Sequence, residues 1–551
     1  MSTSTRSHIR FLALCLIPTA IFIIGSLLQQ LIQPYYAGLS VSDYVQQYSA
    51  EWRGLSVYDY DPAYVYLLNG VGFFHGYVPA HIDHPGTPLQ VLTGIIAFFF
   101  WIANEPTNNF ARSVIALPEH YLRAISQVLL LMNSLAIFRL GRAVYAASEN
   151  FALGFAVQSG FLLLGLLFPR FGYLAPEALI VFAASMMFSE LSPVMFTSGR
   201  GAPAVSTTVK VSFFAALGVA SKVTFCPLLL LLLFLRDRRM ILLSIASTSI
   251  FIIAMLFPIW TTADRMLDWF ISIASHQGIY GGSELGFIAW QEIPGRLRIL
   301  VEFAPYTFAA FGTCILLIGY ELLNRNIGQA AYYSSLLTSA LFVIVGAIKT
   351  LIVLKHFGTH YFLPVMITTP IVLPWCVFRA SQLFIVSSRS MTLYLVGLAV
   401  TCWVIGSAQL FTIIADQKSL AKKRDEDISK LTEVITHYPS AIVVAAYRAR
   451  EANYAVLFGA NQVDPTFAAS LMAGKDSRWT YDRWTSEIIE IRELGTRSMS
   501  TCRFQKQMGS EHEILFLLPA DVQIPELDAQ TLLTNENGDQ LLKTERSGAH
   551  C

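Results

Sequence analysis

Residues 58–90 read YDYDPAYVYLLNGVGFFHGYVPAHIDHPGTPLQ, a polar stretch set between a hydrophobic segment and a shorter apolar run. Among its ionisable side chains are Asp59, Asp61, Asp83, His81 and His84. Prolines and glycines in its second half predict a turned, stiffened backbone rather than a helix. Because ionisable groups beside membrane segments are candidate functional residues, we interpret the stretch as a candidate active-site loop. A solvated connector whose charges merely stay in water is the alternative left open at this point.

The composition assigns the chain to a broad class. Of its 551 residues, 54% are hydrophobic and only 14% are charged, which is typical of a polytopic membrane protein. Lysines and arginines number 38 against 37 aspartates and glutamates, so the basic excess that a nucleic-acid partner calls for is missing from the sequence. The 7 cysteines show no metal-ligand spacing such as CxxC. We therefore expect a protein of the lipid bilayer and predict no nucleic-acid partner and no metal ligands.

Apolar runs long enough to cross a bilayer predict about eleven spans. They lie near 11–32, 121–140, 150–168, 177–196, 205–220, 222–235, 240–260, 303–322, 330–353, 361–380 and 391–414. The first is expected to be an uncleaved signal-anchor, since its apolar part exceeds a signal-peptide core and no small-residue cleavage pattern follows it.

One further apolar run, near 89–103, decides the topology. If it crossed the membrane, the Arg139 and Arg142 pair and the basic cluster at 236–239 would move outside, against the positive-inside rule. We therefore expect an embedded or interfacial helix there. The stretch from about 34 to 118 then faces outward, as does the tail after Ala415.

The composition turns hydrophilic after Ala415, so we predict a transmembrane domain at 1–415 and a soluble α/β domain at 416–551. A charged helix begins the tail, and AIVVAAY and EILFLLP read as buried strands. We expect YAVLFGANQ and DPTFAASLMAG to form a strand, a turn and a helix, and the last stretch, 534–551, to be loose. The predicted fold class is an all-α polytopic membrane protein with a C-terminal soluble α/β domain.

With this topology, acids and bases gather on the outward face. The set comprises Asp59, Asp61, Asp83, His84, Arg112, Arg123, Arg170, Glu177, Lys222, His276, Lys355, His356 and His360. Cations can bind an anionic headgroup, and a carboxylate can transfer a proton or stabilise charge. Simpler roles stay open: snorkelling anchors for Arg123 and Lys222, surface histidines, and a charge in the first helical turn for Glu177.

Several short motifs occur in the order seen in C-type (GT-C) membrane glycosyltransferases. They are DPAYVYLLNG at 61–70, HPGTPL at 84–89, LAPEALIVFAASMMF at 174–188, GVASKVTFCPLL at 218–229 and HFGTHYFLP at 356–364. Over about residues 9–415 the chain resembles that superfamily, which includes protein O-mannosyltransferases, lipid A aminoarabinose transferases and bacterial galacturonosyltransferases. The tail resembles no family that we can name.

The resemblance implies an inverting transfer of a hexose or pentose from a polyprenyl-phosphate carrier to a lipid, glycan or protein acceptor. The reaction would take place on the outer face of the bacterial cytoplasmic (inner) membrane. The family's proposed base matches Asp61, with Asp59 as an extra acid that leaves the choice open, and its second acidic position matches Glu177.

The family's basic position at a junction of short helices matches Lys222, and its basic or histidine position before FLP matches His360 and Tyr361. We expect Asp83, His84 and Arg123 to contribute to substrate binding as well. Some relatives need a divalent metal and others do not, so no cofactor is assigned.

A transporter or flippase for a lipid-linked saccharide is the alternative from another class. It predicts ionisable residues in mid-span and paired broken helices from internal repeats. Here the spans are nearly free of charge away from their ends, with Lys349 the main exception, and the two halves do not repeat. These features favour the transferase.

Overall fold

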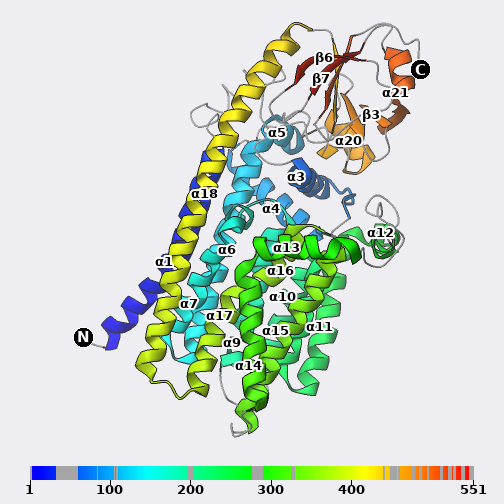
Figure 1. Cartoon of the computed structure of the whole chain (residues 1–551). Helices are drawn as coiled ribbons and strands as arrows, with labels where there is room; N and C mark the ends of the chain where they lie inside the picture. Colours follow the sequence, from blue (N-terminus) through cyan, green and yellow to red (C-terminus); the bar gives the residue numbers. More distant parts are fainter. Residues whose placement is uncertain are drawn as a thin grey trace. The chain divides into compact units, whose positions relative to one another are not determined.

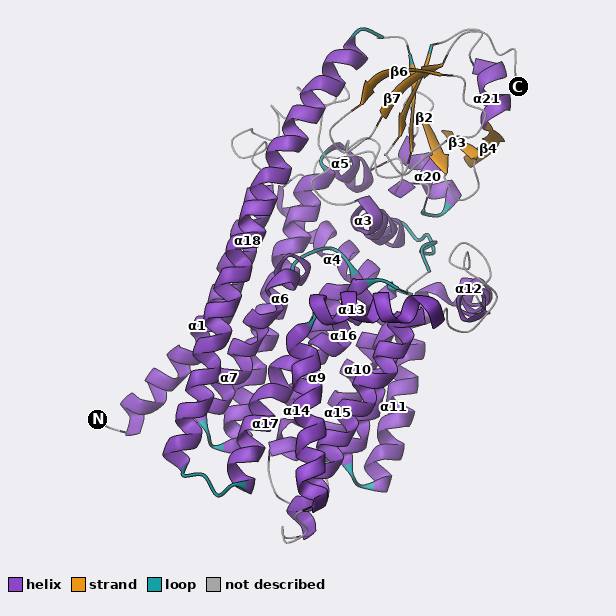
Figure 2. Ribbon diagram, viewed as in Figure 1, coloured by secondary structure: helices purple, strands orange, loops and turns teal. Residues whose placement is uncertain are grey.

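A computed structural model of the chain is shown in Figures 1 and 2. It describes residues 3–32, 60–82, 85–104, 106, 109–196, 203–275, 290–323, 329–355, 357–438, 441–446, 456, 459–460, 462–472, 478–482, 487–492, 495–508, 513–518, 524, 529–534 and 540–544. The chain divides into two units. Unit 1 is Met1–Leu28, Asp83–Pro88 and Gln127–Ile414, and unit 2 is Gln29–Ile82, Leu89–Ser126 and Ala415–Cys551. The predicted boundaries at 1–415 and 416–551 stay a prediction.

Unit 1 is built from helices. All or part of the following belong to it: α1 (Thr3–Ile32), α6 (Pro118–Ser148), α7 (Phe151–Gly160), η1 (Phe161–Leu167), α8 (Phe168–Phe171), α9 (Pro176–Phe196), α10 (Val205–Ser221), η2 (Val223–Leu235), α11 (Arg238–Leu256), η3 (Phe257–Thr262), α12 (Ala263–Ser275), η4 (Trp290–Glu292), α13 (Ile293–Phe303), α14 (Pro305–Leu323), α15 (Gln329–Lys355), η5 (Thr359–Phe362), α16 (Leu363–Met366), α17 (Thr369–Leu383) and α18 (Ser388–Thr436). Every predicted span falls on one or more of these helices.

Within the described residues, nine helices are long and apolar enough to cross a membrane. The chain is thus a multi-pass membrane protein. Three of the eleven predicted segments, at 150–168, 205–220 and 222–235, form shorter apolar helices, which leaves eight, and Thr87–Asn104 is the ninth helix. Thr87–Asn104, the run expected to be embedded, is itself long enough to span by length and composition, so its embedding stays a prediction.

The helix η2 shows how a short run can still cover much of a bilayer. It is a 3₁₀ helix of 13 residues with Pro227 inside it. A 3₁₀ helix rises about 2 Å per residue, so η2 extends about 26 Å, close to the hydrocarbon thickness of about 30 Å.

The core of unit 1 is packed with aromatic and aliphatic side chains. The ring of Phe342 on α15 lies 6.3 Å from that of Phe188 on α9 and 5.8 Å from that of Phe234 on η2. All three side chains are fully buried. These contacts bring α9, η2 and α15 together; Glu177 lies on α9, Lys349 lies on α15, and Lys222 directly precedes η2.

Unit 2 contains α3 (Tyr60–Phe74), most of α4 (Thr87–Asn104) and α5 (Phe110–Ala116). Helix α3 begins at Tyr60, so Asp61 lies within its first turn. In the second half of the loop, α3 is followed by a turn at His75 and Gly76 and by a non-helical backbone from Tyr77 to Ile82, as predicted for this part. Helices α3 and α4 touch backbone to backbone, since a Cβ on Gly70 would stand 2.6 Å from the carbonyl oxygen of Gln90.

The C-terminal part of unit 2 holds a seven-stranded sheet in the order β4-β3-β2-β1-β5-β7-β6 (Figure 2). The strands are β1 (Ile442–Ala446), β2 (Arg478–Asp482), β3 (Glu487–Arg492), β4 (Gly495–Ser500), β5 (Ile514–Leu518), β6 (Ala529–Thr534) and β7 (Gln540–Thr544), with helices α20 (Pro465–Met472) and α21 (Thr501–Met508). The central strand β1 runs parallel to β2 and β5, and the outer pairs are antiparallel. The predicted fold class, a helical membrane protein with a C-terminal α/β domain, is confirmed.

Two details of the tail were predicted wrongly. The described residues of YAVLFGANQ that precede the turn, Val456, Gly459 and Ala460, are helical rather than extended. The last stretch is not loose throughout, because β7 pairs with both β5 and β6. The strand β7 reads QLLKT, which is short and does not alternate between apolar and polar residues, so the sequence signal for a strand was weak.

Candidate functional site

A buried ion pair joins two of the predicted site residues. The Nζ of Lys222 donates a hydrogen bond to Oε1 of Glu177 over 2.6 Å. The two side chains are only 3% and 5% exposed. A carboxylate and an ammonium group buried together compensate each other's loss of hydration, so removing either would leave an unpaired charge in the protein interior.

Local sequence explains where the two residues stand. Helix α9 begins at Pro176, whose ring suits the first helical position, and Glu177 follows in the first turn, where a negative charge is favourable. Lys222 ends α10 with an extended backbone (φ −159°, ψ 124°) and precedes η2 directly. The break between these two short helices places the lysine at a helix junction, as the motif order predicted.

His360 and Tyr361 lie beside this pair. The Nζ of Lys222 is 4.8 Å from the centroid of the Tyr361 ring, a cation–π distance. The rings of His360 and Tyr361, on η5, have their centroids 4.1 Å apart. Gly358 allows this arrangement, because a Cβ there would stand 2.8 Å from the Tyr361 ring. Four predicted site residues from three distant segments therefore come together within unit 1.

Two further basic residues act on the same site. Arg170 on α8 interacts electrostatically with Glu177. Lys349 on α15 is fully buried, donates a hydrogen bond of 2.7 Å to the carbonyl oxygen of Thr224, and interacts electrostatically with Lys222. Among the described residues, the basic side chains of Lys222 and Arg170 thus act on the single carboxylate of Glu177.

Sequence reasoning missed Lys349 as a site residue. In the sequence, Lys349 stands out only as the main exception among spans that are nearly free of charge. A basic residue in mid-span is itself a sign of function, and that signal could have found it.

The remaining predicted residues are placed less completely. Asp61 lies in the first turn of α3, and Arg123 lies half-buried on α6. Asp59, Asp83 and His84 lie outside the described residues. No group of three or more His, Cys, Asp or Glu side chains that could hold a metal occurs in the described part of the chain. The need for a divalent ion therefore stays open.

Two tyrosines of the candidate loop are not available to stack on a sugar. The hydroxyl of Tyr64 donates a hydrogen bond to Oε1 of Glu119, and the Tyr66 ring lies 5.4 Å from that of His81. Both tyrosine side chains are completely buried. Both side chains therefore pack α3 within unit 2.

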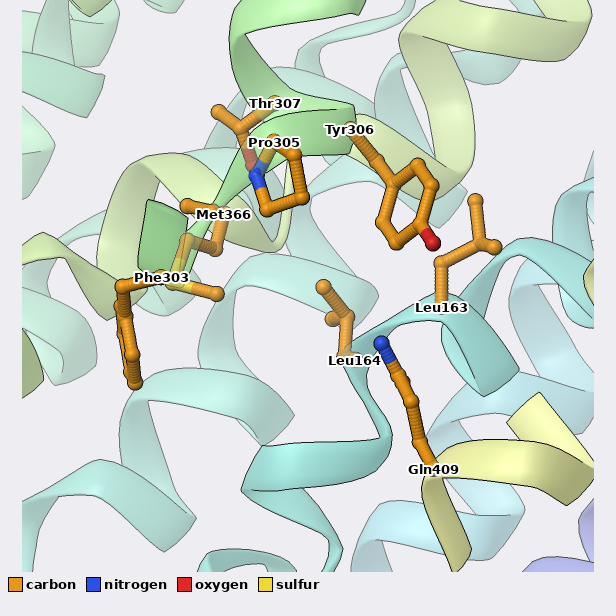
Figure 3. A pocket seen from close by; sticks show the side chains of 9 residues that line it. Leu163, Leu164, Phe303, Pro305, Tyr306, Thr307, Met366 and Gln409 are labelled. Carbon is orange, nitrogen blue, oxygen red and sulfur yellow. The ribbon is translucent and has the colours of Figure 1, made fainter. Parts of the chain in front are cut away.

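A small pocket lies elsewhere in unit 1 (Figure 3). It is lined by Leu163, Leu164, Phe303, Ala304, Pro305, Tyr306, Thr307, Met366 and Gln409. Its volume of about 10 Å³ holds about one water molecule. None of the predicted site residues lines it, and it is too small for a sugar or a lipid chain.

No protein-family model and no curated protein matches the chain. Two solved structures do, both of ArnT from Cupriavidus metallidurans. The structure bound to undecaprenyl phosphate aligns with a TM-score of 0.47 and the apo structure with 0.48. Each alignment covers 92% of this chain and 97% of the other, at 11% sequence identity. Because the identity and the TM-scores are this low, we infer the function from the residues of this chain and not from these two structures.

Proposed function

We propose that this chain is a C-type glycosyltransferase that moves a sugar from a polyprenyl-phosphate carrier to a lipid, glycan or protein acceptor. The proposed location is the outer face of the bacterial cytoplasmic membrane. The observation that carries the proposal is the buried Lys222–Glu177 pair with His360 and Tyr361 beside it. These are the positions that the motif order singled out, and they come together in space.

The leaving group is a lipid phosphate. A polyprenyl carrier stays in the bilayer, so its phosphate reaches the protein at headgroup depth. Lys222 can donate a charge-assisted hydrogen bond to the phosphate oxygens as negative charge develops on them. Glu177 holds the ammonium group in place and offsets its charge before substrate arrives, so we assign Glu177 a positioning role in addition to its predicted acidic role.

The surplus of basic side chains supports an anionic ligand. Lys222 and Arg170 act on this site against the single carboxylate of Glu177. An incoming phosphate would balance this surplus, whereas a neutral ligand would not. Tyr361 and His360 lie beside the Lys222–Glu177 pair, and we assign them contacts with the sugar.

The acceptor is activated by a carboxylate. Asp61 takes the proton of the acceptor hydroxyl, and the acceptor oxygen bonds to the anomeric carbon. The bond from that carbon to the phosphate oxygen breaks with inversion, and polyprenyl phosphate leaves. Asp59 is the alternative base, and Asp83, His84 and Arg123 are proposed substrate-binding residues. By the predicted topology, Asp61 and Lys222 belong to the same membrane face.

The flippase alternative expects charged side chains along a translocation path. The main mid-span charge, Lys349, is instead fully buried and hydrogen-bonded to a backbone carbonyl oxygen. That environment favours a fixed structural or electrostatic role over a lining of a water-filled path.

Mass analysis of envelope glycolipids and glycans tests the proposal in cells with and without the protein. We expect one component to lose the mass of one sugar when the protein is absent and to regain it on complementation. An unchanged set of envelope components, with no lipid-linked sugar accumulating, would contradict it.

A further inference from the structure

Asn69, in the middle of α3, has every hydrogen-bonding position of its side chain used. Its Nδ2 donates to the carbonyl oxygens of Val65 (2.8 Å) and Gln462 (3.0 Å). Its Oδ1 accepts from the backbone N–H of Ala80 (2.8 Å) and of His81 (3.5 Å). An Asn side chain offers two donors and two acceptor positions, so this one is saturated. It is 1% exposed and ties α3, the 77–82 backbone and the C-terminal tail together.

A second contact lies one turn further along α3. The ring of Phe467, at the start of α20, lies 5.6 Å from the His75 ring and 5.0 Å from the Tyr77 ring. A Cβ on Gly72 would stand 2.9 Å from this ring, so only glycine leaves room for it. Asp464 fixes Phe467 in turn, because its Oδ1 accepts hydrogen bonds from the N–H groups of Thr466 and Phe467.

The tail also approaches the backbone of α3 directly. A Cβ on Gly459 would stand 3.1 Å from the carbonyl oxygen of Tyr64 and 3.0 Å from a methyl group of Leu68. Three separate contacts, at Tyr64, Asn69 and Gly72, therefore follow one side of the helix over about two turns. A surface that merely touches a neighbour would not be expected to combine a saturated buried amide with two glycines that allow close approach.

We infer that the tail segment 459–467 is a positioning element for α3, and through it for Asp61 in the first turn of that helix. The inference rests on the proposed function in assigning chemistry to Asp61. Asn69 follows Asp61 by eight positions, about 12 Å along the helix axis. We call the contacts of Asn69, Gly72 and Gly459 the clamp on α3. A helix held at this distance moves as one body, so loss of these contacts would shift Asp61 as well. The C-terminal domain thereby becomes a part of the catalytic apparatus without touching the substrate.

Full-length protein in lipid nanodiscs carries the test. Asn69→Leu keeps the side-chain volume and removes the hydrogen bonds. We expect hydrogen–deuterium exchange in 62–74 to become on the order of tenfold faster. We expect kcat to fall on the order of ten- to a hundredfold, with KM for the lipid-linked donor little changed, because the displaced group acts in the chemical step.

A double-mutant cycle distinguishes loss of the contact from misfolding of a variant. Gly72→Ala pushes against the Phe467 ring, and Phe467→Leu makes room. If the contact positions α3, the double variant should recover most of the kcat that Gly72→Ala loses. Gly397→Ala on α18 is the matched control, since a Cβ there meets nothing within 4 Å, and it should change neither quantity.

The outcomes separate the two claims. Unchanged exchange in 62–74 for Asn69→Leu, or faster exchange in an active enzyme whose kcat does not fall, would overturn the positioning role. A wild-type protein that transfers no sugar would contradict the proposed function instead, and the exchange measurement would still decide whether 459–467 holds α3.

Discussion

Lys222 and Glu177 lie 45 positions apart in the chain, yet the lysine Nζ and a carboxylate oxygen meet at 2.6 Å in a nearly solvent-free place. Each residue alone has an ordinary explanation, as a snorkelling cation or as a charge at a helix start. The pair excludes the snorkelling explanation for Lys222 in this structure, because its ammonium group points to a buried carboxylate rather than to water.

Lys222→Met is predicted to slow transfer by about a hundred- to a thousandfold, about 3–4 kcal/mol, if the ammonium group stabilises the leaving phosphate. The same change leaves Glu177 buried and unpaired, which should cost about 3–5 kcal/mol of stability. Turnover of a polyprenyl-phosphate donor and the apparent Tm in detergent measure the two effects.

The double variant Glu177→Gln/Lys222→Met separates them. Removing both charges should restore most of the apparent Tm, because no unpaired charge remains, while transfer stays lost. Recovery of transfer along with stability would return the pair to a purely structural role.

Gly94→Ala is predicted to destabilise unit 2. The added methyl would meet the carbonyl oxygen of Gly70, a backbone atom that cannot turn aside as a side chain can. Overpacking of this kind costs about 1–3 kcal/mol. The apparent Tm should fall, whereas Gly397→Ala, with open space around it, should be neutral or slightly stabilising. Equal Tm values for the two variants would show that α3 and α4 do not need their close contact.

The topology is predicted to place the C-terminal domain outside. Single cysteines at the exposed Ser470 and Ser387, in a variant lacking Cys502 and Cys551, report it through a membrane-impermeant thiol reagent. Ser470→Cys should react in cells whose inner membrane is intact, and Ser387→Cys only after lysis. The reverse pattern would invert the assignment and remove the tail from the proposed active face.

The helical part of the fold could be predicted because apolar runs of sufficient length are a strong signal, and each predicted span lies on a helix. The 3₁₀ conformation of η2 could not be predicted, since hydropathy does not distinguish a 3₁₀ helix from an α-helix. Glu177, Lys222, His360 and Tyr361 were found through motif order, but their pairing was not, because spacing does not show which charges meet.

The clamp on α3 could not be predicted at all. Asn69 and Gln462 are 393 residues apart, and the contact uses a neutral amide, a backbone carbonyl and glycines. None of these carries a charge or a periodic pattern that sequence reasoning can detect. Buried neutral contacts between distant segments are where the sequence alone is least informative.

The most direct test of the central claim is release of polyprenyl phosphate by purified protein in detergent. In detergent no closed membrane separates two compartments, so a flippase would give no product. The assay contains lipid-linked sugars extracted from cells lacking the protein, together with envelope material from the same cells as acceptor. Asp61→Asn is the matched variant. Asparagine is close to aspartate in size, and losing the charge in the first turn of α3 should cost only about 0.3–1 kcal/mol of stability.

The wild type should release polyprenyl phosphate and add one sugar mass to an acceptor. Asp61→Asn should do so about a hundred- to ten-thousandfold more slowly, as expected for loss of a general base, with an apparent Tm lowered only by that small loss of stability. Near-normal transfer by Asp61→Asn would move the base to Asp59 or Asp83. No release by the wild type from the complete donor extract would contradict the transferase itself.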